Sequence, residues 1–202
     1  ENKVLYDFFS TGTYDRKRPF ILTSSPSMDI LISSNLERLI YLSCGCDAEK
    51  TAELMGELSS DGKYTVTEDM RKFMSDFWGG YAGEEENAAV IRSVFQSCGY
   101  LMDTHTGVAA AVSRQYKEKT GDERKMLIAS TASPFKFAGS VLKAVNGTGE
   151  GMDEFAVVDE LSRVSGMPVP AAVEEIRTAP VRHTRECGPE NMEETVAEIL
   201  GC

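Results

Sequence analysis

Basic residues are scarce in this 202-residue chain: Asp and Glu outnumber Lys and Arg by 32 to 21, for a formal net charge of −11. No basic stripe is present, so the charge argues against a surface for nucleic acid or for an anionic membrane. No apolar run approaches the roughly 18 residues that a membrane span requires. With 42% hydrophobic residues, the chain can still bury a core, and its length fits one domain with or without an appendage.

Cysteine is also sparse. Its five positions are odd in number and unevenly spaced, which favours reduced thiols in a cytosolic (cytoplasmic) protein over a disulfide framework. The Cys44-Gly-Cys46 pair has no second pair beside it, and structural zinc needs four ligands. We therefore expect no metal site. The cysteines are Cys44, Cys46, Cys98, Cys187 and Cys202.

Several familiar motifs are missing, namely GxGxxG, the P-loop lysine, HExxH and GxSxG. Only two histidines are present. His183 lies in an alternating run and is interpreted as an exposed or edge residue. His105 lies in "DTHTG", where a loop enters a predicted helix. Asp103 and Thr104 beside it favour helix capping, although the same residues would suit an active-site wall at a helix amino end.

The spacing of apolar residues predicts strands that alternate with helices. Such alternation indicates an α/β fold, and the helical share is high. The expected strands cover residues 20–23, 63–66, 125–130 and 180–186. The expected helices cover residues 4–9, 35–44, 47–58, 67–82, 84–98, 103–121, 135–145, 153–165, 170–176 and 189–200.

The stretch "IASTASPFKF" combines the end of a predicted strand with adjacent hydroxyls, Ser130 and Thr131, and a proline turn. Ligands of open α/β sheets bind at the carboxyl ends of strands. We therefore expect the strand over 125–130 to lie inside a sheet, with its carboxyl end at a cleft. The alternative is that the hydroxyls only satisfy backbone groups of the turn and cap the next helix.

Four segments together resemble one family: "ENKVLYDFFSTGTYD", "SPSMDILISSNLERL", "GYLMDTHTGVAAAV" and "STASPFKF". In this order they are similar to the bacterial and fungal type of threonine synthase, and the resemblance covers nearly the whole chain. It implies a helix-rich part of the tryptophan-synthase-like fold (fold type II) and the cofactor pyridoxal 5'-phosphate. The implied reaction converts O-phosphohomoserine and water into L-threonine and phosphate, a carbon-oxygen lyase reaction on a phosphate ester.

The resemblance also implies that part of the enzyme lies outside these residues. In the family, the Schiff-base lysine and the glycine-rich phosphate cradle belong to the amino-terminal half, and neither motif occurs here. Residues 1–202 are thus expected to be a carboxy-terminal portion, whose partners are the missing amino-terminal half and the small-molecule substrate. The start of the chain, inside a helix and without methionine, predicts the same. Alone, the chain is expected to be inactive, and none of its lysines is assigned a catalytic role.

Site residues follow from the resemblance by position. In relatives, a hydroxyl of the S-T-A stretch contacts the pyridine nitrogen of the cofactor, which implies this role for Thr131, with Ser130 beside it. A neutral hydroxyl leaves the ring a weaker electron sink than a carboxylate would. Many relatives carry histidine where this chain has Ser133, so no role of that histidine can be transferred.

The candidates for the substrate cleft are His105, Asp103, Thr104 and Asn35. Two other functions stay open. One is a threonine synthase-like phospholyase that releases 2-oxobutyrate from the same substrate. The other is a non-catalytic α/β module kept for its surface, although several active-site-like loops without an active site would then be hard to explain.

Overall fold

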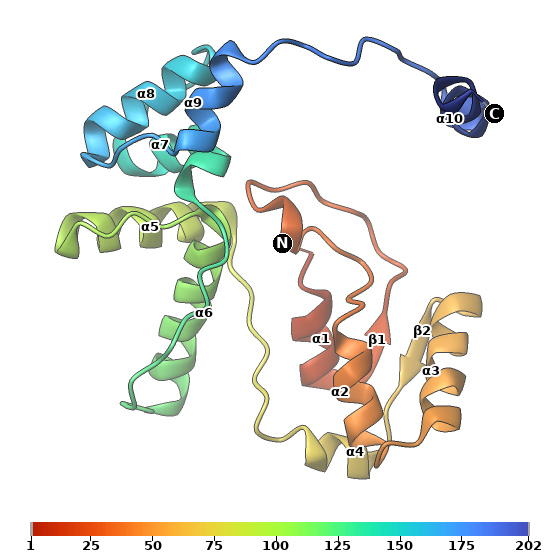
Figure 1. Cartoon of the computed structure of the whole chain (residues 1–202). Helices are drawn as coiled ribbons and strands as arrows, with labels where there is room; N and C mark the ends of the chain where they lie inside the picture. Colours follow the sequence, from red (N-terminus) through yellow and green to blue (C-terminus); the bar gives the residue numbers. More distant parts are fainter. Residues whose placement is uncertain (1, 202) are drawn as a thin grey trace. The chain divides into compact units, whose positions relative to one another are not determined.

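The structure, a computed structural model, describes residues 2–201. It contains two compact units, Glu1–Pro168 and Val169–Cys202 (Figure 1). The first unit contains α1 (Val4–Thr11), β1 (Thr13–Asp15), η1 (Pro26–Met28), α2 (Leu36–Ser43), α3 (Ala48–Ser60), β2 (Lys63–Thr65), α4 (Glu68–Phe73), α5 (Glu84–Cys98), α6 (Thr104–Thr120), η2 (Pro134–Phe137), α7 (Ala138–Asn146) and α8 (Glu154–Ser165). The second contains α9 (Ala171–Thr178), η3 (Pro189–Asn191) and α10 (Met192–Leu200).

The described sheet is a single antiparallel pair, β1 with β2, with Tyr14 opposite Tyr64. Because side chains alternate along a strand, both central tyrosines point inward, and their rings stack with centroids 5.4 Å apart. Phe8 of α1 and Ile40 of α2 are almost fully buried in the same cluster. This aromatic and aliphatic core holds α1, α2, α3 and α4 around the two-stranded sheet.

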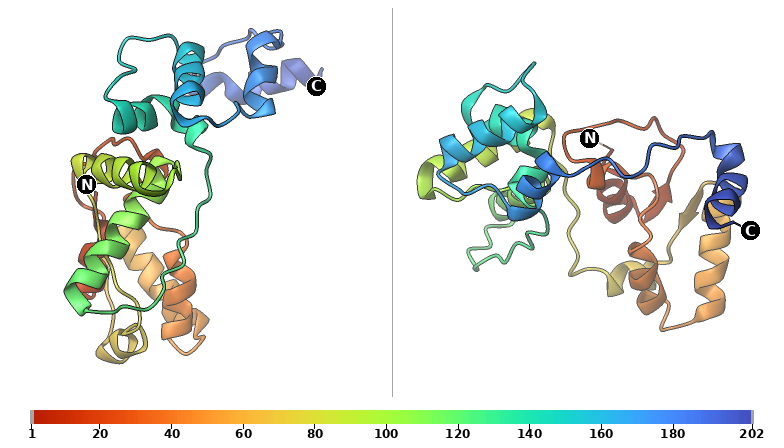
Figure 2. Two further views of the ribbon diagram at one scale, coloured as in Figure 1. Left: turned by 90° about the vertical axis from the view of Figure 1, so that its left-hand side faces the viewer. Right: turned by 45° about the horizontal axis from the view of Figure 1, so that its top comes forward.

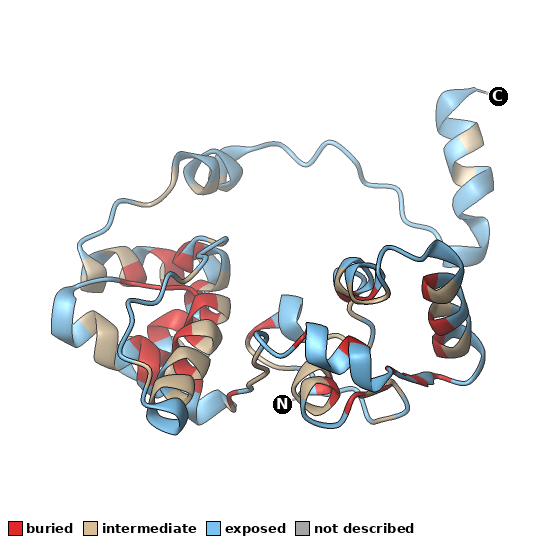
Figure 3. Ribbon diagram, turned by 90° about the horizontal axis from the view of Figure 1, so that it is seen from below, coloured by how far each residue is buried: buried red, intermediate tan, exposed pale blue. Residues whose placement is uncertain are grey.

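Helix α5 packs against both α6 and α7, and α7 in turn packs against α8. Small residues on α6, namely Gly107, Ala110 and Ala111, are buried, which lets helices approach closely. Leu142 of α7 and Leu161 of α8 have no exposed surface at all. Figure 3 shows these buried residues in red on the facing sides of the helices.

Most of the predicted helices are confirmed, and several begin where a capping residue stands. The side chains of Asp47 and Thr67 accept hydrogen bonds from backbone N–H groups of α3 and α4. Helix α5 covers the predicted residues 84–98, and α6 ends at Gly121, whose φ of +70° suits glycine. The helix predicted over 67–82 is shorter, since α4 ends at Phe73.

Three predicted strands, over 20–23, 125–130 and 180–186, are not formed. The expectation that residues 125–130 lie inside a sheet is wrong for this structure. Leu22 is 82% exposed and Leu127 is 99% exposed, so these two apolar side chains are largely uncovered by the described residues. A strand needs a neighbour to take its backbone hydrogen bonds. The strand over 63–66 is confirmed as β2, whereas β1 escaped prediction because "TYD" is too short to show a period.

The second unit contributes little core. The described residues of α10 are exposed or half-buried, and Figure 3 shows the helix mostly in pale blue. Arg185 pairs with Glu198 across the unit at 3.1 Å. His183 is exposed, as interpreted from its sequence context. Among residues 2–201, no helix is both long and apolar enough to cross a membrane.

Candidate functional site

The amino end of α6 is built on Asp103, whose side chain has no exposed surface. Its Oδ1 accepts hydrogen bonds from the backbone N–H groups of His105, at 2.9 Å, and Thr106, at 3.4 Å. This is the N-cap arrangement that "DTHT" predicts, so the capping interpretation of Asp103 is confirmed. The carboxylate also lies at the positive end of the helix dipole, which stabilises its charge.

Thr106 extends this buried group toward the predicted cofactor residues. Its hydroxyl donates to Asp103 Oδ2, and it lies 3.0 Å from the hydroxyl of Ser130. A hydroxyl carries one proton, so Ser130 is the donor to Thr106 when Thr106 donates to the carboxylate. Asp103, Thr106 and Ser130 therefore form a chain of hydrogen bonds that leads from the buried cap to the surface.

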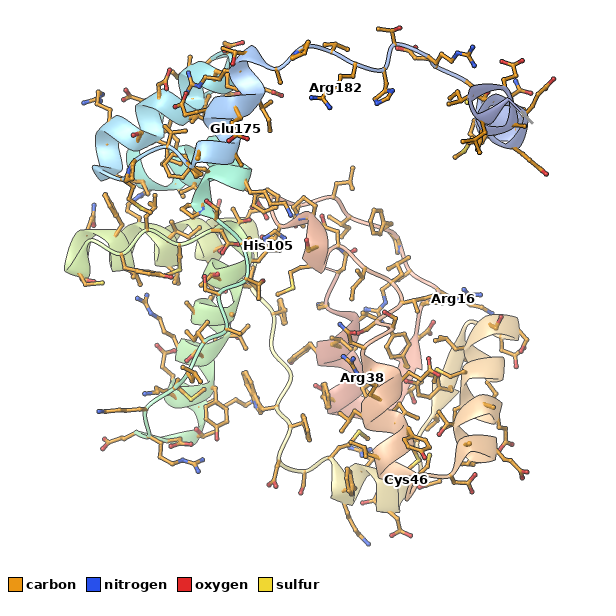
Figure 4. The ribbon with its side chains drawn as sticks, in the orientation of Figure 1. Arg16, Arg38, Cys46, His105, Glu175 and Arg182 are labelled. Carbon is orange, nitrogen blue, oxygen red and sulfur yellow. The ribbon has the colours of Figure 1, made fainter. Side chains whose placement is uncertain are left out.

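His105 uses both of its ring nitrogens. Nδ1 lies 3.1 Å from Asp103 Oδ1, and Nε2 accepts the backbone N–H of Ser27 at 3.0 Å. The ring also lies against Phe137, with centroids 4.7 Å apart. Figure 4 labels His105 at the start of α6, beside the turn that contains η1. Helix α6 and the loop near residue 27 are thus joined through one imidazole.

The charge of Asp103 is set by two opposing effects. Burial alone would raise the pKa of its carboxyl, but the hydrogen bonds from Thr106 and His105 outweigh burial and hold the pKa below its ordinary value. Asp103 is therefore ionised at neutral pH. A buried carboxylate that accepts this many hydrogen bonds is a fixed structural charge, because few of its lone pairs remain for a substrate.

Thr104 and Asn87 tie the same loop to α6 and α5. The Thr104 hydroxyl donates to the carbonyl oxygen of Ser24 at 2.8 Å, and the Asn87 amide lies 3.4 Å from the Ser25 hydroxyl. Thr104, Asn87 and Ser25 are each buried. A loop fixed by this many buried polar contacts is rigid in position. Three of the four predicted cleft residues, Asp103, Thr104 and His105, are consecutive in the chain, and all three take part in this group of contacts.

Ser130 and Thr131 lie near the end of the segment that leads from α6 to η2, and both are exposed. Figure 2 shows this segment returning along α6. A hollow of about 690 Å³ lies between α6 and this segment. Its wall includes Thr106, Lys117, Lys125 and Ser130, but Thr131 is not among the residues that line it. Because Ser130 gives its one proton to Thr106, the exposed hydroxyl of Thr131 is the one of the two that can donate a neutral hydrogen bond to a pyridine nitrogen. The residues present therefore fit that one contact of the predicted cofactor.

The fourth predicted cleft residue, Asn35, is not joined to this group. It precedes α2, is exposed, and accepts a hydrogen bond from Arg38 Nη2 at 3.0 Å. Both residues line a separate hollow of about 660 Å³ between α2 and α3. Among the hydrogen bonds of the described residues, none links Asn35 to His105.

Sequence reasoning missed the direct role of Thr106 and the backbone of Ser27. Thr106 follows the cap by three residues, a spacing at which a hydroxyl can reach back to an N-cap carboxylate. The bond from Ser27 to His105 joins residues 78 positions apart, and no local pattern marks such a contact. No group of three or more potential metal ligands is found in the part of the chain that the structure describes, and its four cysteines are free thiols.

Comparisons with known proteins give a consistent result. A family model described as "Threonine synthase, C-terminal" matches residues 106–185. Human threonine synthase-like 1 is 38% identical over 147 residues, which is 72% of this chain and 19% of that protein. Threonine synthase of Saccharomyces cerevisiae is 33% identical over 182 residues, 82% of this chain and 35% of that protein. The chain thus spans about a fifth to a third of the length of these curated relatives.

Solved structures agree. The threonine synthase from yeast superposes with a TM-score of 0.78 and 26% identity, covering 99% of this chain and 40% of that one. The PLP-bound threonine synthase from Brucella melitensis gives a TM-score of 0.66 and 33% identity, covering 80% and 34%. The fold is accordingly a helix-rich α/β part of fold type II. The chain belongs to the threonine synthase family and corresponds to its carboxy-terminal region.

Proposed function

We propose that this chain is the carboxy-terminal part of an enzyme that converts O-phosphohomoserine and water into L-threonine and phosphate. The observation that carries the proposal is the row of hydrogen bonds that links Asp103, Thr106 and Ser130 at the amino end of α6. This row occurs in a polypeptide that is similar to threonine synthase over most of its length. Threonine synthase of Brucella melitensis binds pyridoxal phosphate. We infer the same cofactor for the whole enzyme here.

In this proposal, the cofactor ring supplies the electron sink that lets phosphate leave and water add. The chain's own residues do the positioning. Thr131, with Ser130 beside it, offers a neutral hydrogen bond to the pyridine nitrogen. Asp103 anchors the group through Thr106, because its buried charge fixes the direction of that hydroxyl. His105 and Thr104 hold the neighbouring loop as part of the cleft wall.

The proposed partner is the amino-terminal half, which would supply the lysine that holds the cofactor and the phosphate cradle. The apolar segment 125–130 supports this. Leu127 is almost fully exposed and Met126 is 44% exposed, although their sequence favours a buried strand. Pairing with a strand of the amino-terminal half would cover both side chains and satisfy the backbone.

A second candidate is a phospholyase that releases 2-oxobutyrate, ammonia and phosphate from the same substrate and water; the similarity to proteins named threonine synthase-like 1 keeps a reaction other than threonine synthesis in view. A product assay on the whole protein separates the possibilities. Threonine and phosphate in equal amounts support the synthase. Production of 2-oxobutyrate with ammonia supports the phospholyase, and the absence of phosphate release with substrate and cofactor present would favour a non-catalytic module.

A further inference from the structure

The loop of residues 23–29 is closed on itself and attached to two helices. Asp29 closes it, accepting the backbone N–H of Thr23 at 2.7 Å and the Thr23 hydroxyl at 2.8 Å. Glu84, at the start of α5, accepts the backbone N–H of Ser24 at 3.2 Å. On the two sides of the middle of the loop, Ser25 is held by Asn87 and the backbone N–H of Ser27 is held by His105.

The network of hydrogen bonds fixes the protonation of His105. Nε2 accepts the N–H of Ser27, so that nitrogen carries no proton. Nδ1 therefore carries the ring proton, and it points to the Asp103 carboxylate at 3.1 Å. The side chain of His105 is 12% exposed, whereas Ser27 at the other end of the Nε2 bond is exposed. An ionised carboxylate that holds an imidazole in one tautomer makes the other nitrogen a better acceptor.

Capping does not explain the imidazole. The cap uses the backbone N–H of His105, which any residue at this position supplies. The ring instead bonds to a loop 78 residues earlier in the chain, and it packs on Phe137 on its other side. The imidazole therefore serves a tertiary contact between α6 and this loop.

We propose that Asp103 and His105 form a latch that positions the 23–29 loop, with His105 as a positioning residue for the substrate cleft. The loop forms one wall of a hollow of about 150 Å³ whose lining includes Thr23, Ser25, Met28, Lys3 and Tyr81. Lys3 supplies a cation there, with its Nζ 5.0 Å from the centre of the Tyr81 ring. The carboxylates of Asp29 and Glu84 also line the hollow, so groups of both charge signs and hydroxyls surround it, which suits a small zwitterionic molecule. The catalytic meaning of the latch therefore rests on the proposed function.

The latch is tested by amide hydrogen exchange of Ser27 in the whole protein, with two variants that separate the ring nitrogens. His105→Asn keeps a donor near Asp103 but lacks an acceptor at the position of Nε2. His105→Gln places an acceptor close to that position. We expect exchange at Ser27 to be roughly two- to tenfold faster in the Asn variant, the loss of about one hydrogen bond, and close to wild type in the Gln variant.

Ser27→Ala is the matched control, because the donor is the backbone N–H and the Ala variant keeps it; its protection should equal that of wild type. Equal protection of Ser27 in wild type and the Asn variant would overturn the proposal, and so would equal loss in the Asn and Gln variants. If the enzyme makes threonine, the Asn variant should also raise KM more than it lowers kcat, with recovery in the Gln variant. Exchange is read without substrate, so it tests the latch even if the proposed reaction fails.

Discussion

Asn87 of α5 packs against Gly107 of α6, and this contact sets how closely the two helices approach. A methyl group added at Gly107 would collide with Asn87 Oδ1 and come within 2.8 Å of Ile91 Cγ1. Asn87 and Ile91 are both at least 98% buried, so neither side chain can turn away into solvent. The backbone of Gly107 is helical, a conformation that any residue can adopt, so conformation alone does not require glycine here. Packing against Asn87 and Ile91 requires it.

Gly107→Ala is therefore expected to destabilise the protein by about 1–3 kcal/mol, the usual cost of overpacking a core. Gly139→Ala is the control, because Gly139 lies in α7 with nothing within 4 Å of its added methyl group. That variant should be stabilised by about 0.4–1 kcal/mol through the less flexible unfolded chain. Urea unfolding of both variants measures the difference, and equal stabilities would contradict the close packing of α5 on α6.

A second prediction concerns the buried cap of α6. Asp103→Asn keeps a good N-cap residue but removes the charge, so charge-assisted hydrogen bonds become neutral ones, at a cost of about 1 kcal/mol at pH 7. Asp153→Asn is the control, since Asp153 caps α8 through two similar backbone bonds but is exposed. Its substitution should cost only a few tenths of a kcal/mol.

The cost at Asp103 should depend on pH. Its pKa is lower in the folded state, so its charge stabilises the fold above the unfolded pKa of about 3.9, and that stability is lost as pH falls toward the folded pKa. The gap in unfolding free energy between wild type and Asp103→Asn should accordingly shrink below about pH 4. A gap that stays constant from pH 7 to pH 3 would show that the carboxylate contributes nothing through its charge.

These two sites show what the sequence could and could not predict. The cap at Asp103 was predictable because capping is local, and the same holds for the start of α4 at Thr67. The contact between Asn87 and Gly107 was not, since helix packing brings together residues 20 positions apart by a route that no local pattern encodes. Residues 125–130 are a different case. The strand pattern is present, but a strand forms only with a partner, which the described residues do not supply.

A third prediction follows for that segment. Leu127→Lys should change the stability of the isolated chain by less than about 0.5 kcal/mol, because the leucine is 99% exposed and no contact is lost. In the whole enzyme, the same change should be strongly destabilising if the segment becomes a covered strand, since a lysine there would be buried without a partner. Thermal unfolding of both forms decides the point; a neutral effect in the whole enzyme would rule out the proposed pairing.

The fourth prediction concerns the isolated chain and the cofactor. When the isolated chain is mixed with pyridoxal phosphate, the cofactor should react only to form nonspecific adducts with its lysines. The reason is that none of these lysines stands in the anchoring motif of the family. Borohydride reduction followed by peptide mapping should find label spread over several lysines at low occupancy. One lysine labelled stoichiometrically would mean that this chain holds its own cofactor site, contrary to the proposed role of the amino-terminal half.

The last prediction concerns Thr131 in the whole enzyme. Thr131→Ala removes one neutral hydrogen bond, typically worth about 0.5–1.5 kcal/mol, so cofactor affinity should fall by roughly two- to tenfold. Turnover should fall further if the bond matters most in the transition state. Thr131→Asp should act differently, because a carboxylate at the ring nitrogen favours its protonation and strengthens the electron sink. We expect that variant to form more 2-oxobutyrate relative to threonine.

Ser133→Ala is the control for these variants. It removes a neighbouring hydroxyl that caps η2 by accepting the backbone N–H of Phe135, and it should leave the product ratio unchanged. If wild type and both Thr131 variants share one cofactor spectrum and one product ratio, Thr131 is a turn residue, and the ring nitrogen is held by another group.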